Sequence, residues 1–316
     1  MDTVSFKVDT GALEASDTPE QVLARHGRTF HFASKLMSPT MTLRCARLYA
    51  FCRYVDDLAD ESSDTQRADM RLERLALQLR QGRAHDPVAQ DFLELVADCD
   101  MDLAPALELI RGVRSDLGRV RFADQRTLHR YCYRVAGTVG LMMCDVLGVE
   151  DPQAYRYAID LGIAMQLTNI ARDVHEDAQQ DRRYVPGPLV SQAEPAAIAA
   201  PDARLQRELR SAVDWLLLEA DRYYRSAAIG YRYLPGRART AIRVAARVYR
   251  AIGTELRRQD CASWRGRAYV PGWKKPLLAL GQFPAAARDG LRRRDATHTP
   301  GLHRHLDGLY GAASQP

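Results

Sequence analysis

Several features common in other protein classes are scarce or missing in this 316-residue sequence. The longest uncharged apolar run covers only residues 135–144, about half of what a membrane-spanning helix needs. The N-terminus has no basic segment leading into an apolar one, so no secretory signal is predicted. Lysine occurs only four times although the net charge is +5, because arginine supplies nearly all the positive charge. We expect a cytoplasmic globular protein, and this charge alone predicts no nucleic-acid partner.

The cysteine pattern excludes the common zinc and redox sites. No two of the six cysteines have the Cys-x-x-Cys spacing that such sites use. Several cysteines lie inside apolar helical patterns, which favours reduced thiols in a protein core.

Signals for β-structure are also missing. We find no alternating strand of useful length, and no Asn-Gly or Asp-Gly hairpin signal between two such strands. Long windows without proline, rich in Ala, Leu and Arg, are instead typical of helices. These windows are residues 40–86, 106–151, 153–185, 202–234 and 236–270. The sequence therefore predicts an all-α fold with about eight to eleven helices in one main body.

The ends of the chain differ from this body in composition. We expect residues 1–19 to be an N-terminal extension and residues 20–285 to form the domain. Residues 286–316 carry several arginines with little apolar periodicity, which predicts a basic, weakly ordered tail. Peripheral contact of this arginine-rich end with an anionic membrane is one interpretation, and a solvated surface is the other.

The segment from residue 49 to residue 61, YAFCRYVDDLADE, predicts an amphipathic helix. At 100° per residue, Tyr49, Arg53, Asp56 and Asp60 fall on one face, opposite an apolar face. Taken alone, such a pattern also fits an ordinary helix with its polar face in water.

A second segment has the same arrangement. Gln166, Asn169, Asp173 and Asp177 form a polar stripe on a helix whose N-terminal half is apolar around most of its circumference. Such a helix is buried, and buried carboxylates are costly unless they are paired, hydrogen-bonded or bound to a metal.

The chain thus carries two Asp-x-x-x-Asp pairs, each spanning one helical turn. Carboxylates at this spacing can share Mg²⁺, which prefers oxygen ligands and bridges carboxylates to substrate phosphates. Two such helices facing each other would place a metal-bridged diphosphate at the mouth of an apolar cavity. This arrangement suits the ionisation of an allylic diphosphate.

A third segment, residues 131–143, places Ala136, Gly137 and Gly140 inside a predicted helix. Glycine is unfavourable there, so we expect close helix packing or a kink beside a ligand.

Three motifs, in this order, resemble the squalene/phytoene synthase family of head-to-head isoprenyl diphosphate synthases. They are YAFCRYVDDLADE (49–61), YCYRVAGTVGLMM (131–143) and QLTNIARDVHEDAQQDRRYVP (166–186), with a weaker match at HGRTFHFASKLM (26–37). The resemblance implies an all-α isoprenoid-synthase helical bundle with a central active-site cavity.

The resemblance also implies roles for individual residues. Asp56 and Asp60 would form the first metal-binding pair, and Asn169, Asp173 and Asp177 the second cluster. Diphosphate would be held by Arg53, Gln166, Tyr249 and Arg267. Tyr49 would line the reaction centre, and Tyr49 together with the four aspartates would be catalytic. Mg²⁺ is the expected ion, with Mn²⁺ as an alternative.

The family condenses two prenyl diphosphates through a cyclopropylcarbinyl diphosphate and rearranges the product to a linear terpene precursor. Arg134 stands where squalene synthases have an aromatic residue, and the small pair Ala33 and Ser34 leaves room for a longer tail. Both favour a phytoene synthase acting on C20 diphosphates, for which NADPH is not expected. The alternative is a C15 enzyme making dehydrosqualene or squalene.

Two other classes are weighed against this one. A class I terpene cyclase would share the aspartate motifs, but Asp173 stands where its second motif has Ser or Thr, and it lacks the segment 131–143. A non-catalytic helical assembly protein would be expected to have lost the paired aspartates. We predict that Asp56→Ala or Asp173→Ala abolishes turnover and leaves the fold nearly intact.

Overall fold

The computed structural model describes residues 17–60, 64–292, 297–299 and 301–312, except for the side chain of Asp60. Most of the expected N-terminal extension therefore lies outside the described residues. Within them the chain forms fourteen α-helices and four short helical turns, and its only β pairing is a single bridge between Arg121 and Arg183. The all-α prediction is confirmed.

The α-helices have the following bounds: α1 Pro19–His26, α2 Arg28–Ser34, α3 Pro39–Asp60, α4 Thr65–Arg80, α5 Pro87–Cys99, α6 Ala104–Arg114, α7 Gln125–Cys132, α8 Thr138–Val146, α9 Gln153–Gln179, α10 Pro195–Ala199, α11 Ala203–Gly230, α12 Gly236–Arg258, α13 Lys274–Leu280 and α14 Phe283–Gly290. The helical turns are a π turn at Tyr133–Gly137 and 3₁₀ turns at Gly187–Val190, Tyr231–Tyr233 and Ser263–Arg265.

Helix starts follow the sequence signals closely. Asp64, Asp124 and Asp202 each cap a helix by accepting a hydrogen bond from a backbone N–H of its first turn. The described chain has more helices than the eight to eleven that we predict, because proline-rich segments also form short ones. Proline fits the first turn of a helix, and α10 and α14 have it there.

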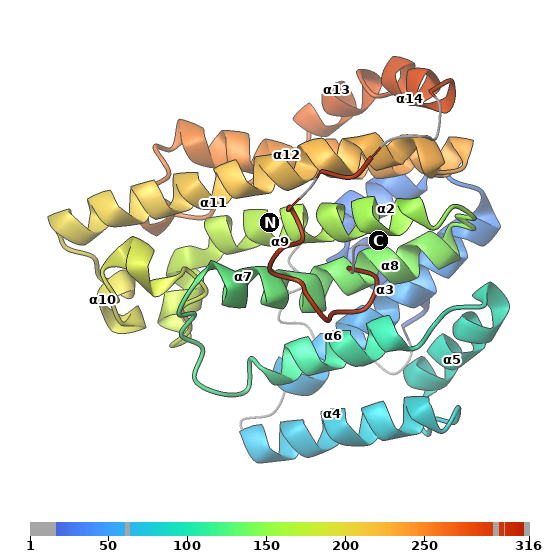
Figure 1. The fold of residues 1–316 in the computed structure, drawn as a ribbon, viewed down its shortest axis with the longest axis horizontal. Helices are drawn as coiled ribbons and strands as arrows, with labels where there is room; N and C mark the ends of the chain where they lie inside the picture. The colour runs from blue at the N-terminus through green and yellow to red at the C-terminus, as the bar shows by residue number, and fades with distance from the viewer. Residues whose placement is uncertain (1–16, 61–63, 293–296, 300, 313–316) are drawn as a thin grey trace.

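Helix α9 lies at the centre of the bundle (Figure 1). It packs along α11 and also contacts α8, α10 and α12, while α3 packs against α8 on another side. Eighteen residues of α9 are buried, including Asp160 and Asp173. A helix that is buried around its whole circumference explains why its polar residues need specific partners.

Glycine lets α9 approach the segment before it. A Cβ on Gly162 would lie 2.2 Å from the carbonyl oxygen of Ala136, and one on Gly140 would lie 2.3 Å from that of Ala158. Between α7 and α8 the helix widens into the π turn. The unfavourable glycines of this segment therefore serve both close packing and an irregular turn.

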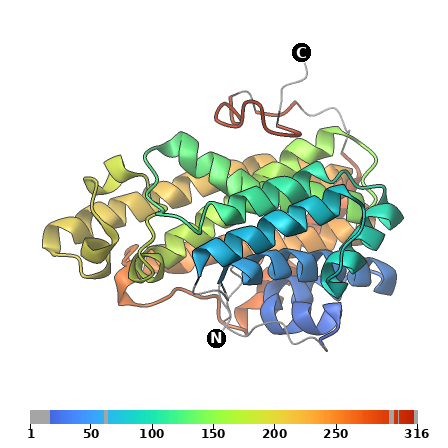
Figure 2. The same cartoon turned by 90° about the horizontal axis from the view of Figure 1, so that it is seen from below.

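Described parts of the chain beyond residue 285, where we expect a weakly ordered tail, pack against the body. Leu302, Leu306 and Leu309 are buried against the body, and Tyr133 donates a hydrogen bond to the carbonyl of Tyr310 at 2.6 Å. This C-terminal segment, residues 297–299 and 301–312, crosses the outside of the bundle (Figure 2). Its leucines recur every three or four residues, a weak signal that the arginines around them obscure.

Candidate active site

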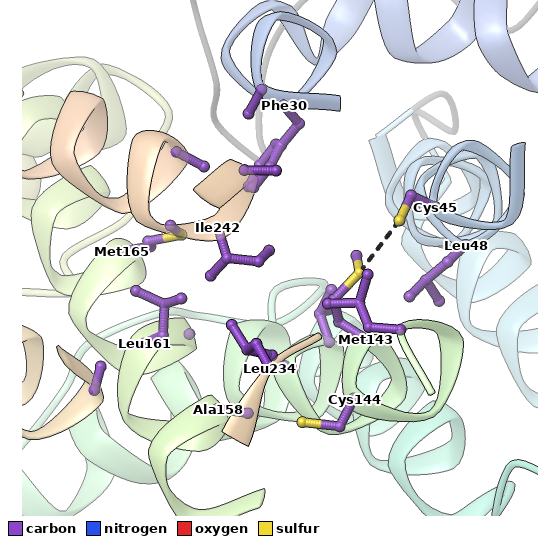
Figure 3. Close-up of a pocket in the computed structure, with 18 of the residues that line it drawn as sticks. Phe30, Cys45, Leu48, Met143, Cys144, Ala158, Leu161, Met165, Leu234 and Ile242 are labelled. Atoms are coloured by element: carbon purple, nitrogen blue, oxygen red, sulfur yellow. Dashed lines mark hydrogen bonds between the residues drawn. The ribbon is translucent and has the colours of Figure 1, made fainter. Parts of the chain in front are cut away.

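An apolar pocket lies between α2, α3, α8, α9 and α12. Figure 3 shows Phe30 at one end, Cys45 and Leu48 of α3 on one side, and Leu161 and Met165 of α9 opposite them. The lining is almost wholly hydrocarbon and sulfur. Such a pocket suits a long apolar ligand and offers few groups that could react with a carbocation.

The apolar lining of the pocket gives way to polar side chains at the same end of three helices. Its lining ends at Tyr49 on α3, at Met165 on α9 and at Ala245 on α12. Polar side chains follow directly on each helix, namely Arg53, Asp56 and Asp57 on α3, Gln166, Asn169 and Asp173 on α9, and Tyr249 on α12. The motifs that are far apart in the sequence thus meet at one polar end of an apolar pocket.

Aromatic rings separate the two regions. The ring of Phe30 lies 6.4 Å from that of Tyr49 and 5.8 Å from that of Tyr249, centroid to centroid. Burial raises the pKa of both phenols far above its ordinary value. The nearby Tyr249 raises the pKa of Tyr49 further, whereas the charge of Arg172 partly lowers that of Tyr249. Both tyrosines therefore stay neutral and can only donate or accept hydrogen bonds.

The first motif contains an ion pair between Arg53 and Asp57, and Asp57 is not among the site residues predicted from the sequence. A guanidinium nitrogen of Arg53 lies 2.7 Å from a carboxylate oxygen of Asp57, one helical turn later, and both side chains are buried. Asp56 is also buried, and its charge contributes to the raised pKa of Tyr49. Asp60 ends α3, and its side chain lies outside the described residues.

Asp173 is at the centre of the second motif. Its carboxylate accepts a hydrogen bond from Nε of Arg172 at 2.7 Å, and Nε of Arg267 lies 2.9 Å from the same oxygen. Arg172 is one of the largest fully buried side chains of the protein. The family resemblance implies a role for Arg267 but none for Arg172, although an arginine directly before the aspartate of a buried helix is a usable signal.

The other predicted residues of the second motif, Gln166, Asn169 and Asp177, have contacts of their own. Asn169 donates a hydrogen bond to the side chain of Gln166 at 3.3 Å, and a hydrogen bond with Asn169 lowers the pKa of Tyr249 against the effect of burial. Asp177 is half-buried one turn beyond Asp173. Asp173 and Arg267 thus come together beside Asn169 and Tyr249, and Asp177 lies close to Tyr184.

These contacts change the expectation for Asp173→Ala. The carboxylate is a charge partner of a fully buried arginine, so its removal affects the fold as well as any metal.

Comparisons with known proteins identify the family. The sequence model of the squalene/phytoene synthase family matches residues 23–274. The chain belongs to this family.

Relatives of known name are similar along most of their length. The 15-cis-phytoene synthase of Enterobacter agglomerans is 34% identical over 284 residues, which cover 86% of this chain and 95% of the relative. That of a Paracoccus strain is 37% identical over 283 residues, covering 85% and 91%. The crystal structure of a dehydrosqualene synthase superposes with a TM-score of 0.76 at 28% identity. The superposition covers 85% of the present chain and 95% of the dehydrosqualene synthase chain.

More distant structures share the fold. The squalene synthase HpnC of Alicyclobacillus acidocaldarius superposes with a TM-score of 0.68 at 24% identity, covering 77% of this chain and 92% of the other. The isoprenoid-synthase helical fold that the motifs imply is therefore confirmed for this family member.

Proposed function

We propose that this protein is a phytoene synthase, which condenses two C20 prenyl diphosphates head to head through a cyclopropylcarbinyl diphosphate. The observation that carries the proposal is a long apolar pocket that ends at a cluster of aspartates and arginines. The similarity to several phytoene synthases at 32–37% identity supports the C20 substrate over the C15 alternative.

The residues at the polar end fit a hard divalent cation. Asp56, Asn169 and Asp173 offer carboxylate and amide oxygens, the donors that Mg²⁺ prefers, and Mn²⁺ accepts the same set. Asp60 and Asp177 would complete the two motifs. Once bound, the metal would stabilise the negative charge of the departing diphosphate.

The arginines would bind the diphosphate itself. Arg267 pairs with Asp173, and its side chain is one-quarter exposed, so it can exchange this partner for a phosphate oxygen. Arg53 is held in place by Asp57, and Gln166 is positioned by its contact with Asn169. These groups would orient the leaving group at the end of the pocket.

The apolar part of the site would protect the carbocation. Phe30, Tyr49 and Tyr249 form an aromatic boundary between the polar end and the pocket. Aromatic faces stabilise positive charge, and the hydrocarbon lining excludes the water that would quench it.

The test is product analysis with purified protein, Mg²⁺ and either C20 or C15 diphosphate, with and without NADPH. We expect a C40 product from the C20 substrate and no effect of NADPH. A C30 product as the main outcome would support the alternative, and cyclic or single-unit products would contradict the head-to-head reaction. Asp56→Asn should abolish turnover, while Asp214→Asn, on the exposed surface of α11, should not.

We also propose that the protein is cytoplasmic and contacts the membrane peripherally. The six cysteines are free, as expected in a reducing compartment. None of the described helices is long and apolar enough to cross a bilayer.

The contact would be made by an apolar surface around α13 and α14, most of which precedes the arginine-rich tail of residues 286–316. Six large apolar side chains are exposed there: Tyr269 (61%), Trp273 (67%), Leu277 (60%), Leu280 (65%), Phe283 (47%) and Leu291 (88%). Residues 269–292 also contain four basic side chains and one acidic one. Of the basic ones, Lys275 is buried and Lys274 pairs with Glu255, which leaves Arg288 and Arg292 at the surface. Exposed aromatic and aliphatic groups beside basic ones are typical of surfaces that bind anionic lipid.

Vesicle co-sedimentation tests this surface. Wild-type protein should bind phosphatidylglycerol vesicles, and the double variant Trp273→Ser/Leu277→Ser should bind several-fold less. Leu218, which is 53% exposed on α11, supplies the matched control: Leu218→Ser should bind as wild type. Equal binding of all three proteins would exclude this surface.

A further inference from the structure

A buried carboxylate joins the C-terminal segment to the central helix. Asp160 of α9 is fully buried, and each of its carboxylate oxygens faces a different imidazole. Nε2 of His298 lies 2.8 Å from Oδ2, and Nε2 of His303 lies 2.7 Å from Oδ1. Neither the resemblance to the family nor the proposed reaction uses these residues.

Among the described residues, the carboxylate of Asp160 has no lysine or arginine beside it to balance its negative charge. A carboxylate without solvent contact is costly unless a positive charge accompanies it. Within the described part of the chain, no lysine or arginine forms an ion pair with Asp160, and its partners are the two histidines. The positive charge must therefore come either from a proton on one of the imidazoles or from a bound metal ion.

The donor set indicates which cation fits. The two ring nitrogens and the carboxylate oxygen all lie within 4.8 Å of one another. Ligands of a tetrahedral zinc ion, each about 2.0–2.2 Å from the metal, lie about 3.3 Å from one another, so small side-chain movements would accommodate the ion. Two imidazoles and one carboxylate suit Zn²⁺ and related transition metals, whereas Mg²⁺ takes sites made of oxygen alone.

We propose that Asp160, His298 and His303 form a transition-metal site of the Zn²⁺ class, which fastens the C-terminal segment to α9. The site is separate from the proposed Mg²⁺ cluster, because Asp160 precedes Asp173 by 13 residues, which is about 20 Å along a helix. This inference does not depend on the proposed reaction.

The proposed metal site lies between the wall of the apolar pocket and the C-terminal segment. Tyr157 lines the apolar pocket on one side, and its ring lies 5.4 Å from that of His298 on the other. Nearby, Tyr223 donates a hydrogen bond to the carbonyl of Leu302 at 3.0 Å. A metal ion here would hold the C-terminal segment against the outer side of the pocket wall.

The test uses the full chain after removal of metals with a chelator. Zn²⁺ is titrated by calorimetry in excess Mg²⁺, so that the oxygen-rich cluster is occupied, and Co²⁺ is titrated in parallel to record its visible absorption. We expect one tightly bound equivalent, the absorption bands of nitrogen-ligated Co²⁺, and a higher unfolding temperature with Zn²⁺.

Variants test whether the bound Zn²⁺ ion is held by these three residues. His303→Ala and Asp160→Asn should each lower the affinity at least tenfold. His305→Ala lies in the same segment, outside the cluster, and should bind as wild type. Circular dichroism checks that each variant is folded, and Asp56→Asn, which should lose turnover, should keep the zinc equivalent.

Two results would overturn the proposal. One is a wild-type protein that takes up no Zn²⁺, in which case a proton bound to a histidine supplies the charge. The other is uptake that His303→Ala and Asp160→Asn leave unchanged, which would place the ion elsewhere.

Discussion

Replacing Asp173 by asparagine should destabilise the protein as well as inactivate it. The substitution keeps the size and shape of the side chain but removes the charge that faces Arg172, whose own side chain is 1% exposed. Arg267 loses the same partner, but its side chain is 25% exposed and can be solvated. The destabilisation therefore comes mainly from Arg172.

The magnitude follows from the burial of the pair. Removing one partner of a buried ion pair costs about 3–5 kcal/mol. Glu176 also attracts Arg172, and the Asp173 side chain retains 12% exposure, so we expect the lower end, about 3 kcal/mol. At about 2 °C per kcal/mol for a long chain, the unfolding temperature should fall by about 6 °C.

The assay is urea and thermal unfolding of three variants beside the wild type. Asp214→Asn breaks an exposed pair with Arg257 at 3.0 Å and serves as the control, which should lose less than about 1 kcal/mol. The double variant Arg172→Met/Asp173→Asn removes both buried charges and should recover part of the lost stability.

The reasoning is refuted if Asp173→Asn unfolds within about 1 °C of the wild type, a change of less than about 0.5 kcal/mol. The prediction also fails if the double variant is less stable than Asp173→Asn, because Arg172 would then stabilise the fold through contacts other than Asp173.

Three further predictions concern the pocket, the packing of α9 and the effect of acid. Ser34 lines the pocket, so Ser34→Phe should shorten the available space and shift the ratio of turnover from C20 toward C15 diphosphate; an unchanged ratio would exclude Ser34 from setting chain length. Gly162→Ala should cost more than about 2 kcal/mol because its Cβ would meet the backbone of Ala136, whereas Gly118→Ala, with open space around it, should be nearly neutral by urea unfolding. Burial lowers the pKa of His129 to about 3. Below pH 6.5 the unfolded chain therefore binds a proton at this residue that the native state does not bind. The free energy of unfolding should fall by up to about 1.4 kcal/mol for each pH unit from 6.5 toward 3. His129→Phe should flatten this slope, and equal slopes for the two proteins between pH 6.5 and 5 would show that another group causes it.

The all-α fold and the meeting of the motifs could be predicted because both depend on local patterns. The absence of proline from long windows indicates helices, and the spacing of Asp56, Asn169 and Asp173 indicates which helix faces carry polar groups. Burial on several sides of one helix then requires partners for these groups. The sequence could not show that Arg172 is the partner of Asp173, because the direction of a side chain on a buried helix depends on the neighbouring helices.

The contacts of the C-terminal segment could not be predicted for a different reason. Asp160 is separated from His298 by 138 residues and from His303 by 143. The periodicity of a single segment carries no information about a partner so far along the chain. The arginines near the end of the chain indicate solvent exposure by composition, and this signal outweighs the few leucines that anchor the segment.

The π turn at Tyr133–Gly137 has a consequence for how the sequence of this protein can vary. Such a turn holds one residue more than an α-helical turn. Deleting a residue there would restore a regular helix and rotate everything after it by about 100°. Gly140 would then no longer face Ala158 of α9, where only a residue without a Cβ fits. We therefore expect this stretch to accept substitutions more readily than any change in length.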